Sequence, residues 1–337
     1  MHGEFDRVFP PGPARMIVDE SQTPQATVLI VTKNRRDDTR KCLQSTAQQT
    51  ARIEVLVIDD ASTDGTAEMV AKEFPGVRVH RRETSAGCVV NRNVGAEMAR
   101  APIIVTIDDD ATFRSLDAIE ITLAEFDNPI VGAIAMPLID SNSPDTVKHR
   151  APDESDVWVT HKFTGAIHAL RRDVFLKFGG FRGALVHFGE EEELCLRLLD
   201  GGYVTRMGTA TPAYHDFSPA RDRVRERFYA ARNVIFWSWM NAPLSVVWQR
   251  MFAQTVRELG YAVRYRMPWV TLRGLFAGYR ESFFGPAPRR PVSKAGWDLW
   301  RELRRSGPFR LRDIRDRLAK PVAGAVNSAP MVESSTN

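Results

Sequence analysis

The sequence predicts an α/β protein with a mostly parallel sheet flanked by helices, followed by a helical C-terminal extension. Short apolar runs rich in β-branched residues alternate with helical segments of about ten residues, which is typical of βαβ units. Two of these runs end in clustered acids, Asp59-Asp60 and Asp108-Asp109-Asp110. After about residue 220 the apolar residues recur at helical spacing instead.

We expect the chain of 337 residues to comprise four regions. Residues 1–25 are predicted to form an irregular, proline-containing arm. Residues 26–220 are predicted to form the main domain, with halves at about 26–112 and 113–220. Residues 221–320 are expected to be a basic helical extension, and residues 321–337 a disordered tail.

The strands and helices of the first half follow from the apolar pattern. Three of the four predicted strands are short, mostly apolar runs, as expected of strands buried on both faces, and Val77–His80 is a short alternating segment. The predicted strands are Ala26–Thr32, Ile53–Ile58, Val77–His80 and Ile103–Ile107, and the predicted helices are Asp37–Gln48, one ending near Glu73, and Asn91–Arg100. Further along, the acids Glu190–Glu193 are predicted to begin a helix over Leu194–Leu199.

Cysteine content and apolar run length bear on where the protein resides. The three cysteines lie far apart and lack metal-ligand spacing, which argues against a disulfide framework and fits a reducing compartment. Residues 1–20 mix charges with prolines, so we expect no signal peptide. No apolar run approaches the ~20 residues that a membrane span needs. We therefore expect a cytoplasmic protein, with peripheral attachment to the inner face of the plasma membrane as one alternative.

The two acid clusters predict one binding site. In open α/β sheets, ligands bind at the carboxyl ends of the strands, and both clusters follow such ends. Three adjacent carboxylates repel one another, which favours a bound divalent cation with oxygen ligands over a purely structural role. A solvated acidic loop is the alternative for Asp108–Asp110 taken alone.

Two common nucleotide-binding motifs are absent from the sequence. Thr32-Lys33-Asn34-Arg35 stands after the first strand, where a dinucleotide-binding protein would carry G-x-G-x-x-G. The pattern G-x-x-x-x-G-K-[ST] does not occur either. A classical dehydrogenase and a P-loop enzyme are therefore disfavoured.

Several segments, taken in order, resemble family-2 glycosyltransferases with the GT-A fold. The resemblance runs from about residue 26 to residue 242, and its specificity lies in the order and spacing of the segments. The matching segments are Val28–Arg35, Ile58–Thr66, Gly87 with Asn91–Gly95, Asp108–Asp110, Thr164–Ala166, Phe178–Phe181, Gly189–Leu198, His215 and Arg232-Asn233.

The resemblance implies a nucleotide-diphospho-sugar donor and a set of residues that bind it. Asp60 matches the acid that contacts the nucleotide base, while Thr32 and Asn34 fall in the segment that lines the base pocket. Arg92 is a candidate contact to the donor, with a structural ion pair as the alternative.

The resemblance also implies Mg²⁺ or Mn²⁺ as the cofactor. Asp110 matches the direct metal ligand of the D-x-D signature, and His215 matches a further ligand found in some members. Asp108 and Asp109 would contact the ribose and metal-bound water, and Asp108 is included in the expected metal group.

The catalytic base is expected in the run Glu190–Glu193. Glu191 matches the family residue that deprotonates the acceptor hydroxyl, and direct displacement with inversion follows from a single base. The family usually has aspartate there, so Glu190 is the alternative by a one-residue slip. Glu192 and Glu193 are expected to be only a favourable acidic first turn.

The sequence of the C-terminal extension predicts helices that either lie on a membrane surface or pack on the main domain. Residues 289–320 contain eleven Lys/Arg and four Asp/Glu, a local charge of +7, while the whole chain carries +4. Basic amphipathic helices with tryptophan on the apolar face are typical of segments that lie on anionic membranes. Packing on the main domain fits the pattern equally well. Nucleic-acid binding fits less well, because no recognition motif accompanies the charge. The apolar stripes are Val224, Phe228, Ala231, Ile235 and Trp239; Trp248, Phe252, Val256, Leu259 and Val263; and Trp297, Trp300 and Leu303.

The leading hypothesis is a metal-dependent inverting glycosyltransferase acting on a glycan, glycolipid or small hydroxyl acceptor, with surface polysaccharide, cell-wall or glycolipid assembly as its context. A sugar-phosphate nucleotidyltransferase would need a glycine-rich loop after the first strand, which Thr32–Arg35 lacks. A non-catalytic nucleotide-sugar or glycan binder would not need Asp110 and Glu191.

Overall fold

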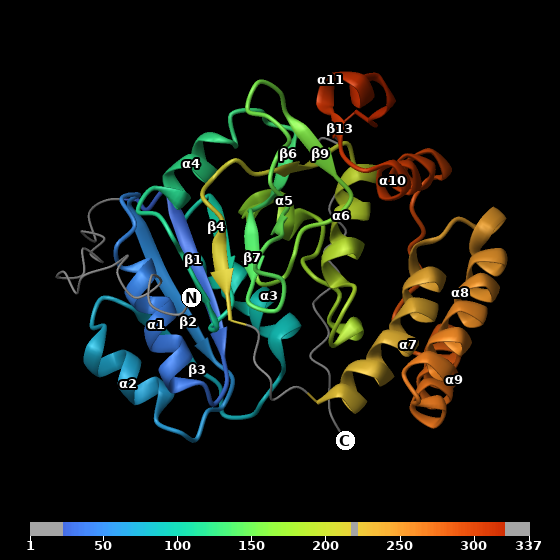
Figure 1. Ribbon diagram of the computed structural model, residues 1–337, viewed down its shortest axis with the longest axis horizontal. Helices are drawn as coiled ribbons and strands as arrows, with labels where there is room; N and C mark the ends of the chain where they lie inside the picture. The colour runs from blue at the N-terminus through green and yellow to red at the C-terminus, as the bar shows by residue number, and fades with distance from the viewer. Residues whose placement is uncertain (1–22, 217–221, 321–337) are drawn as a thin grey trace.

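The computed structural model describes residues 23–216 and 222–320 and has the predicted α/β architecture (Figure 1). The predicted tail at 321–337 and nearly all of the predicted arm lie outside the described residues.

The described residues form a central sheet of nine strands. β1, β2, β3 and β4 run parallel to their neighbours among these four, whereas β10 is antiparallel to both β4 and β6. The sheet is therefore parallel in its first half and mixed in its second. Across the sheet the strands are β13 (Phe309–Arg310), β9 (Trp158–Thr160), β11 (Val204–Met207), β6 (Val131–Ala135), β10 (Ile167–Arg171), β4 (Ile103–Ile107), β1 (Ala26–Thr32), β2 (Ile53–Asp59) and β3 (Arg78–Arg81).

Helices cover both faces of this sheet. Val28 and Ile30 of β1 pack in one core with side chains of α1, α2 and α4, while Leu29 packs in a second core with α3, α5 and α6. Successive side chains of a strand point to opposite faces, so a continuous apolar run serves both cores. The helices are α1 (Arg36–Thr46), α2 (Thr66–Glu73), α3 (Cys88–Met98), α4 (Ala118–Ala124), α5 (Arg172–Lys177) and α6 (Glu190–Asp200).

A second, four-stranded sheet lies beside the carboxyl end of β4. Its strands run in the order β5 (Ala111–Thr112), β12 (Ala213–His215), β7 (Leu138–Asp140) and β8 (Val147–Lys148). In this register His215 lies opposite Ala111 on one side and Asp140 on the other. The small sheet therefore brings together three segments that are far apart in the sequence.

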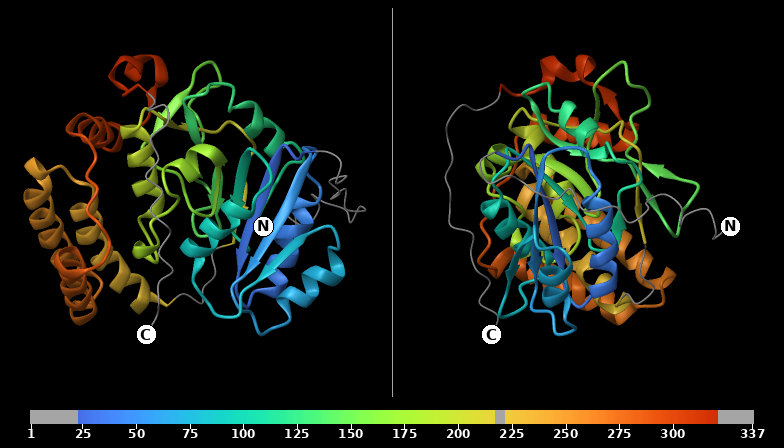
Figure 2. Two further views of the ribbon diagram at one scale, coloured as in Figure 1. Left: turned by 180° about the vertical axis from the view of Figure 1, so that it is seen from behind. Right: turned by 90° about the vertical axis from the view of Figure 1, so that its left-hand side faces the viewer.

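The C-terminal helices form a layer at one edge of the molecule (Figures 1 and 2). α7 (Arg223–Asn241), α8 (Leu244–Arg264) and α9 (Pro268–Phe284) pack together, and α9 approaches α7 closely. A Cβ atom at Gly274 or Gly278 would lie 2.6 or 2.5 Å from a carbonyl oxygen of α7. Glycine at both positions therefore permits this close contact.

α10 (Lys294–Ser306) packs on α6, and the short α11 (Leu311–Ile314) follows. Trp297, Trp300 and Leu303 of α10 are at most 1% exposed. The apolar face of α10 is therefore packed inside the protein, as the packing alternative expects. Within residues 23–216 and 222–320, no helix combines the length and apolar character needed to cross a bilayer.

Candidate active site

Asn34 ties the loop after β1 to the loop after β2. Its backbone is left-handed with a φ of 53°, a conformation that asparagine adopts more readily than most residues. The Asn34 N–H donates to Ser62 Oγ at 2.9 Å, and Asn34 Oδ1 accepts from the Thr63 N–H at 2.7 Å. Beside it, Thr32 is buried and its carbonyl accepts from the Asp60 N–H at 2.9 Å. Thr32, Asn34 and Asp60 thus lie at two adjoining strand ends.

Asp60 organises the loop that leads into α3. Its carboxylate accepts four hydrogen bonds, from Ser85 Oγ at 2.6 Å, the N–H groups of Ala86 and Gly87 at 2.7 and 3.1 Å, and Asn91 Nδ2 at 2.7 Å. Burial disfavours the charged form, but these hydrogen bonds outweigh it and hold the pKa of Asp60 below its ordinary value. Four bonds engage the acceptor capacity of a carboxylate. The Asp60 carboxylate therefore holds the loop before α3 in place.

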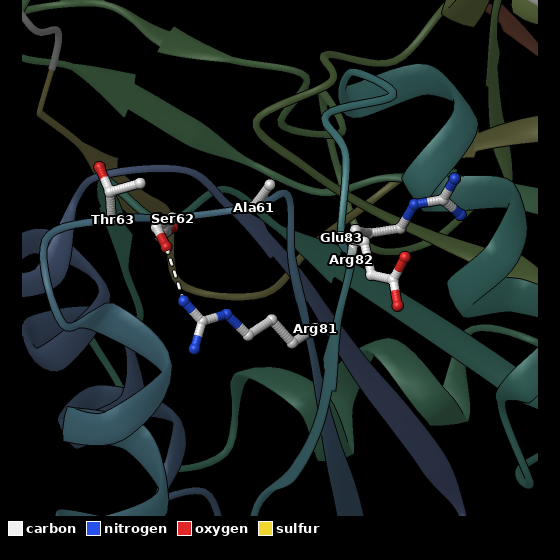
Figure 3. Close-up of a pocket in the computed structure, with 6 residues that line it drawn as sticks. All are labelled: Ala61, Ser62, Thr63, Arg81, Arg82 and Glu83. Carbon is white, nitrogen blue, oxygen red and sulfur yellow. Dashed lines mark hydrogen bonds between the residues drawn. The ribbon is translucent and has the colours of Figure 1, made fainter.

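A pocket of about 360 Å³ opens next to Asp60, at the carboxyl ends of β2 and β3 (Figure 3). Arg81 Nη2 donates to the Ser62 carbonyl at 2.9 Å and closes one side of it. This edge of parallel strands is where open α/β sheets bind ligands. The pocket is lined by Ala61, Ser62, Thr63, Arg81, Arg82 and Glu83.

Arg35 supplies positive charge to the carboxylates that follow β4. Its Nη1 lies 3.3 Å from Asp109 Oδ1 and also pairs with Asp110. Burial raises the pKa of Asp109 to about 7, although Arg35 favours its charged form. Burial acts on Asp110 too, but His215 and Arg35 outweigh it and hold the pKa of Asp110 below its ordinary value. The mutual repulsion of these carboxylates is therefore offset from two sides.

Asp108, Asp110 and His215 form a candidate metal group, with ligand atoms within 4.8 Å of one another. The small sheet assembles it, because β12 pairs with β5 directly after Asp110. Two carboxylates and one imidazole suit Mg²⁺ or Mn²⁺, the latter accepting nitrogen more readily. The donor set therefore fits the cofactor that the sequence implies.

Asp140 orients His215 within this group. Asp140 Oδ1 lies 2.6 Å from His215 Nδ1, while His215 Nε2 lies 3.2 Å from Asp110 Oδ1. Burial disfavours the imidazolium, but the hydrogen bonds to Asp110 and Asp140 outweigh it and raise the pKa of His215 to about 9. In the neutral imidazole, which a metal would bind, a carboxylate on Nδ1 selects the tautomer that leaves Nε2 for the metal.

Arg92 joins the acidic triplet to the start of α6. Its Nη2 donates to Asp108 Oδ1 at 2.7 Å and to the Gly165 carbonyl at 2.9 Å. Its Nη1 lies 3.8 Å from Glu190 Oε1, and the side chain is 5% exposed. Burial disfavours the charge, but the surrounding acidic groups outweigh it and raise the pKa of Arg92. The structural ion pair foreseen as an alternative for Arg92 is therefore present.

Glu190 and Glu191 both lie near Arg92. α6 begins after Gly189, whose φ of 93° favours glycine. A Cβ atom on Gly165 would collide with Glu191 Oε1 and would lie 3.1 Å from Arg92 Nη1, so these side chains cover the Gly165 backbone. Burial, and then the charge of Glu191, raise the pKa of Glu190 to about 8. Burial also raises the pKa of Glu191, with Arg92 opposing it.

Glu192 and Glu193 make structural ion pairs. Glu193 is fully buried and pairs with Arg182 at 3.0 Å and with Arg197 at 2.7 Å. Glu192 lies 3.2 Å from Arg304 and so connects α6 to α10. Both side chains therefore form ion pairs with arginines other than Arg92.

Sequence reasoning missed two contributors to the site. Asp140 ends the short apolar run Leu138-Ile139, which repeats the pattern of strands ending in acids and was a usable signal. Arg35 lies in a segment that was noted for its missing glycines and for its family resemblance, but Arg35 itself was given no role. The predicted residues fall into two groups. One group is connected through Arg92 and the Asp108–Asp110 triplet and contains Asp108, Asp110, His215, Arg92, Glu190 and Glu191. The other lies at the ends of β1 and β2 and contains Thr32, Asn34 and Asp60.

The fold is that of the GT-A class of α/β proteins. The mannosyltransferase PcManGT from Pyrobaculum calidifontis, in complex with GDP-Man and Mn²⁺, has a TM-score of 0.53 and 19% identity, covering 82% of this chain and 92% of that one. S. aureus TarS has a TM-score of 0.57 and 14% identity, covering 77% of this chain and 80% of that one. At these identities the similarity concerns the fold.

Sequence comparison matches part of the chain to a known family. Residues 27–188, which include Asp60, Arg92 and the acidic triplet, match the family model Glycosyl transferase family 2. An uncharacterized glycosyltransferase of Haemophilus influenzae is 27% identical over 182 residues, which cover 51% of this chain and 61% of the relative. The pre-mycofactocin glycosyltransferase of Mycobacterium tuberculosis is 26% identical over 238 residues, covering 65% of this chain and 47% of the relative. The chain thus matches less than two thirds of the length of either relative. Residues 27–188, just under half of the chain, are thus similar to glycosyltransferase family 2.

Proposed function

We propose that the chain transfers a sugar from a nucleotide-diphospho-sugar to an acceptor hydroxyl, with inversion at the anomeric carbon. One observation carries the proposal. The guanidinium of Arg92 bonds Asp108 of the candidate metal group, lies 3.8 Å from Glu190, and is near Glu191 beside Gly165. The candidate metal group, which suits a diphosphate, and the glutamates at the start of α6, which suit proton acceptance, therefore lie on either side of the buried Arg92 side chain.

The donor would bind along the carboxyl edge of β1, β2 and β4. Asp108, Asp110 and His215 would hold Mg²⁺ or Mn²⁺, and the cation, when bound, neutralises charge on the leaving diphosphate. The pocket beside Asp60 has room for part of the nucleotide, with Thr32 and Asn34 at the same edge. Asp60 would support this pocket through the loop that it anchors.

Glu191 would act as the general base. Its carboxylate would accept the acceptor's hydroxyl proton while the acceptor oxygen attacks the anomeric carbon and the bond from that carbon to the diphosphate oxygen breaks. A single displacement of this kind inverts the anomeric configuration. Arg92 would keep the carboxylates of both sides in place, since correct positioning of reacting groups is a major part of catalysis.

Two similar folds indicate which donors to test first. PcManGT was obtained with GDP-Man and Mn²⁺, and S. aureus TarS with UDP-GlcNAc. The acceptor class in the proposal is a glycan, glycolipid or small hydroxyl compound from surface polysaccharide, cell-wall or glycolipid assembly. The three cysteines are free thiols, which supports a reducing, cytoplasmic setting for the reaction.

The proposal is tested by measuring nucleoside-diphosphate release from GDP- and UDP-sugars with Mn²⁺ and a panel of acceptors. Calorimetry with GDP and UDP, with and without EDTA, measures binding separately. We expect metal-dependent binding and acceptor-stimulated release. Absence of nucleotide binding at any metal concentration would contradict the proposal. Tight binding without turnover would favour the non-catalytic binder.

A further inference from the structure

α8 and α9 present a continuous apolar face to solvent. We define the α8–α9 face by Trp248, Phe252 and Val263 of α8 and Trp269, Phe276 and Phe284 of α9. Their exposed fractions are 58%, 69%, 80%, 77%, 72% and 85%, respectively. Large contiguous apolar surfaces are rare on soluble monomers and mark sites of interaction.

Contacts between the two helices make this one surface. The rings of Trp248 and Phe283 stack with centroids 6.1 Å apart, and both pack on Trp239 of α7. At the opposite end a turn of three residues, 265–267, joins α8 to α9. In Figures 1 and 2 the pair forms the outermost layer at one edge of the molecule, remote from the main sheet.

The charges around this face are positive. Residues 244–284 contain six arginines, two glutamates, and no lysine or aspartate. Arg257, Arg264 and Arg273 are exposed. Glu258 is buried and pairs with Arg227 of α7, and Glu281 lies 3.6 Å from Arg280. The surface therefore combines aromatic and aliphatic side chains with arginines and shows solvent little negative charge.

We propose that the α8–α9 face docks on the surface of an anionic lipid bilayer. Helices that lie in a membrane interface place aromatic and aliphatic side chains at the acyl boundary and arginines among the lipid phosphates. A symmetric contact with a second copy would set the same arginines against one another without acids to neutralise them. Charge complementarity therefore selects the anionic bilayer as the occupant.

This location differs from the one that the basic composition of residues 289–320 suggests. There the apolar face of α10 is buried against α6 and α7, so only charge is available to a membrane. On α8 and α9 both apolar and basic groups are exposed together. The proposal concerns binding and does not depend on the proposed transfer reaction.

Flotation of the full chain with vesicles tests this inference. The probes are vesicles of phosphatidylcholine alone and of phosphatidylcholine mixed with phosphatidylglycerol. We expect binding to the mixed vesicles, weakened by salt. The triple variant Phe252→Ser, Trp269→Ser, Phe276→Ser should lose at least 100-fold in affinity, because each ring no longer gains from leaving water. Its unfolding midpoint should not fall, since the three side chains are exposed.

Two variants that each lose three arginines test which basic region of the protein binds the membrane. Arg257→Gln, Arg264→Gln, Arg273→Gln should bind about 100-fold more weakly, since each basic residue near such a membrane contributes about fivefold. Arg301→Gln, Arg305→Gln, Arg315→Gln removes the same charge from the other basic region and should bind nearly normally. Equal losses in the two variants would overturn the placement on α8–α9. Failure of the wild-type chain to float, or a dimer that only the serine variant dissociates, would overturn the membrane proposal.

Discussion

Replacing Glu191 with glutamine is the sharpest test of the proposed chemistry. Glutamine keeps the size and planar shape of the side chain that fills the space beside Gly165 and Arg92. It cannot accept a proton from an acceptor hydroxyl. We therefore expect kcat to fall while donor and metal affinities stay nearly unchanged, the pattern of a group that acts only in the transition state.

The size of the loss follows from the role and from the neighbours. A positioned general base contributes ~10²–10⁴-fold, which corresponds to about 3–5.5 kcal/mol in the barrier. Arg92 keeps its bonds to Asp108 and Gly165 in this variant, so the site should hold its geometry. The charge of Glu191 helps to raise the pKa of Glu190 to about 8, so removing that charge should lower the pKa of Glu190. Residual activity with a stronger contribution from Glu190 is therefore expected near neutral pH.

Glu190→Gln is the matched control, because it removes one carboxylate from the same helix start. Glu190 is 5% exposed and, with a pKa of about 8, is mostly protonated at pH 7, so its replacement should affect kcat far less. The assay is nucleoside-diphosphate release with a saturating donor and acceptor, beside calorimetry with the nucleotide. Collapse in Glu190→Gln with near-normal turnover in Glu191→Gln would move the base by one residue. Near-normal turnover in both would remove these glutamates from the chemistry.

Four further changes probe the metal, the nucleotide, the buried glutamate and the C-terminal packing. Asp110→Ala should abolish Mn²⁺-dependent nucleotide binding measured by calorimetry, and EDTA-insensitive binding of full affinity would contradict the metal assignment. Asp60→Ala should release the loop before α3 and weaken nucleotide binding while the metal dependence persists, whereas normal affinity would refute the placement of the nucleotide. Because the pKa of Glu190 rises from 4.5 to about 8 on folding, the folded state holds that proton more tightly, and stability should fall as pH rises through this window. Glu190→Gln should flatten that dependence and stabilise the protein above pH 8, as read from thermal unfolding at a series of pH values. Trp300→Ala should cost about 3–5 kcal/mol in chemical unfolding, because the ring is fully buried beside Trp237 and Trp297, and a loss below 1 kcal/mol would show that α10 packs loosely.

The sequence predicted the first half of the fold most closely. β1 and β4 begin and end at the predicted residues, because the short length and the β-branched residues of these bounded runs favour a buried strand over a helix. α3 begins at Cys88, three residues before the predicted start, since Asp60 fixes the preceding loop through the Ala86 and Gly87 amides. The antiparallel β10 between β4 and β6 was not foreseen. Strand direction depends on pairing across the sheet, which single-strand patterns do not encode.

The sequence indicated many residues of the candidate site, but it did not indicate which of them contact one another. Asp108, Asp110 and His215 come together because β12 pairs with β5 and β7, and these strands have only two or three residues each. Runs that short carry no measurable period, so sequence reasoning could not pair them or see that Asp140 meets His215. Arg92 was recognised as a candidate, but its bond to Asp108 and its contact with Glu190 depend on the tertiary placement of α3 against α6.

Apolar periodicity identifies a helix without saying what its apolar stripe faces, and α8 is the clearest case here. Its buried positions include the polar Gln254 and Glu258, whereas Trp248, Phe252 and Val256 are more than half exposed. The more apolar side of this helix thus faces solvent, the reverse of an ordinary surface helix. Glu258 forms an ion pair with Arg227 of α7, so the buried side of α8 makes a specific contact with α7. A helix that pairs buried polar side chains inside the protein and leaves its largest apolar side chains outside favours a further apolar partner. The surrounding arginines favour a partner that is negatively charged at its surface, as the membrane proposal expects.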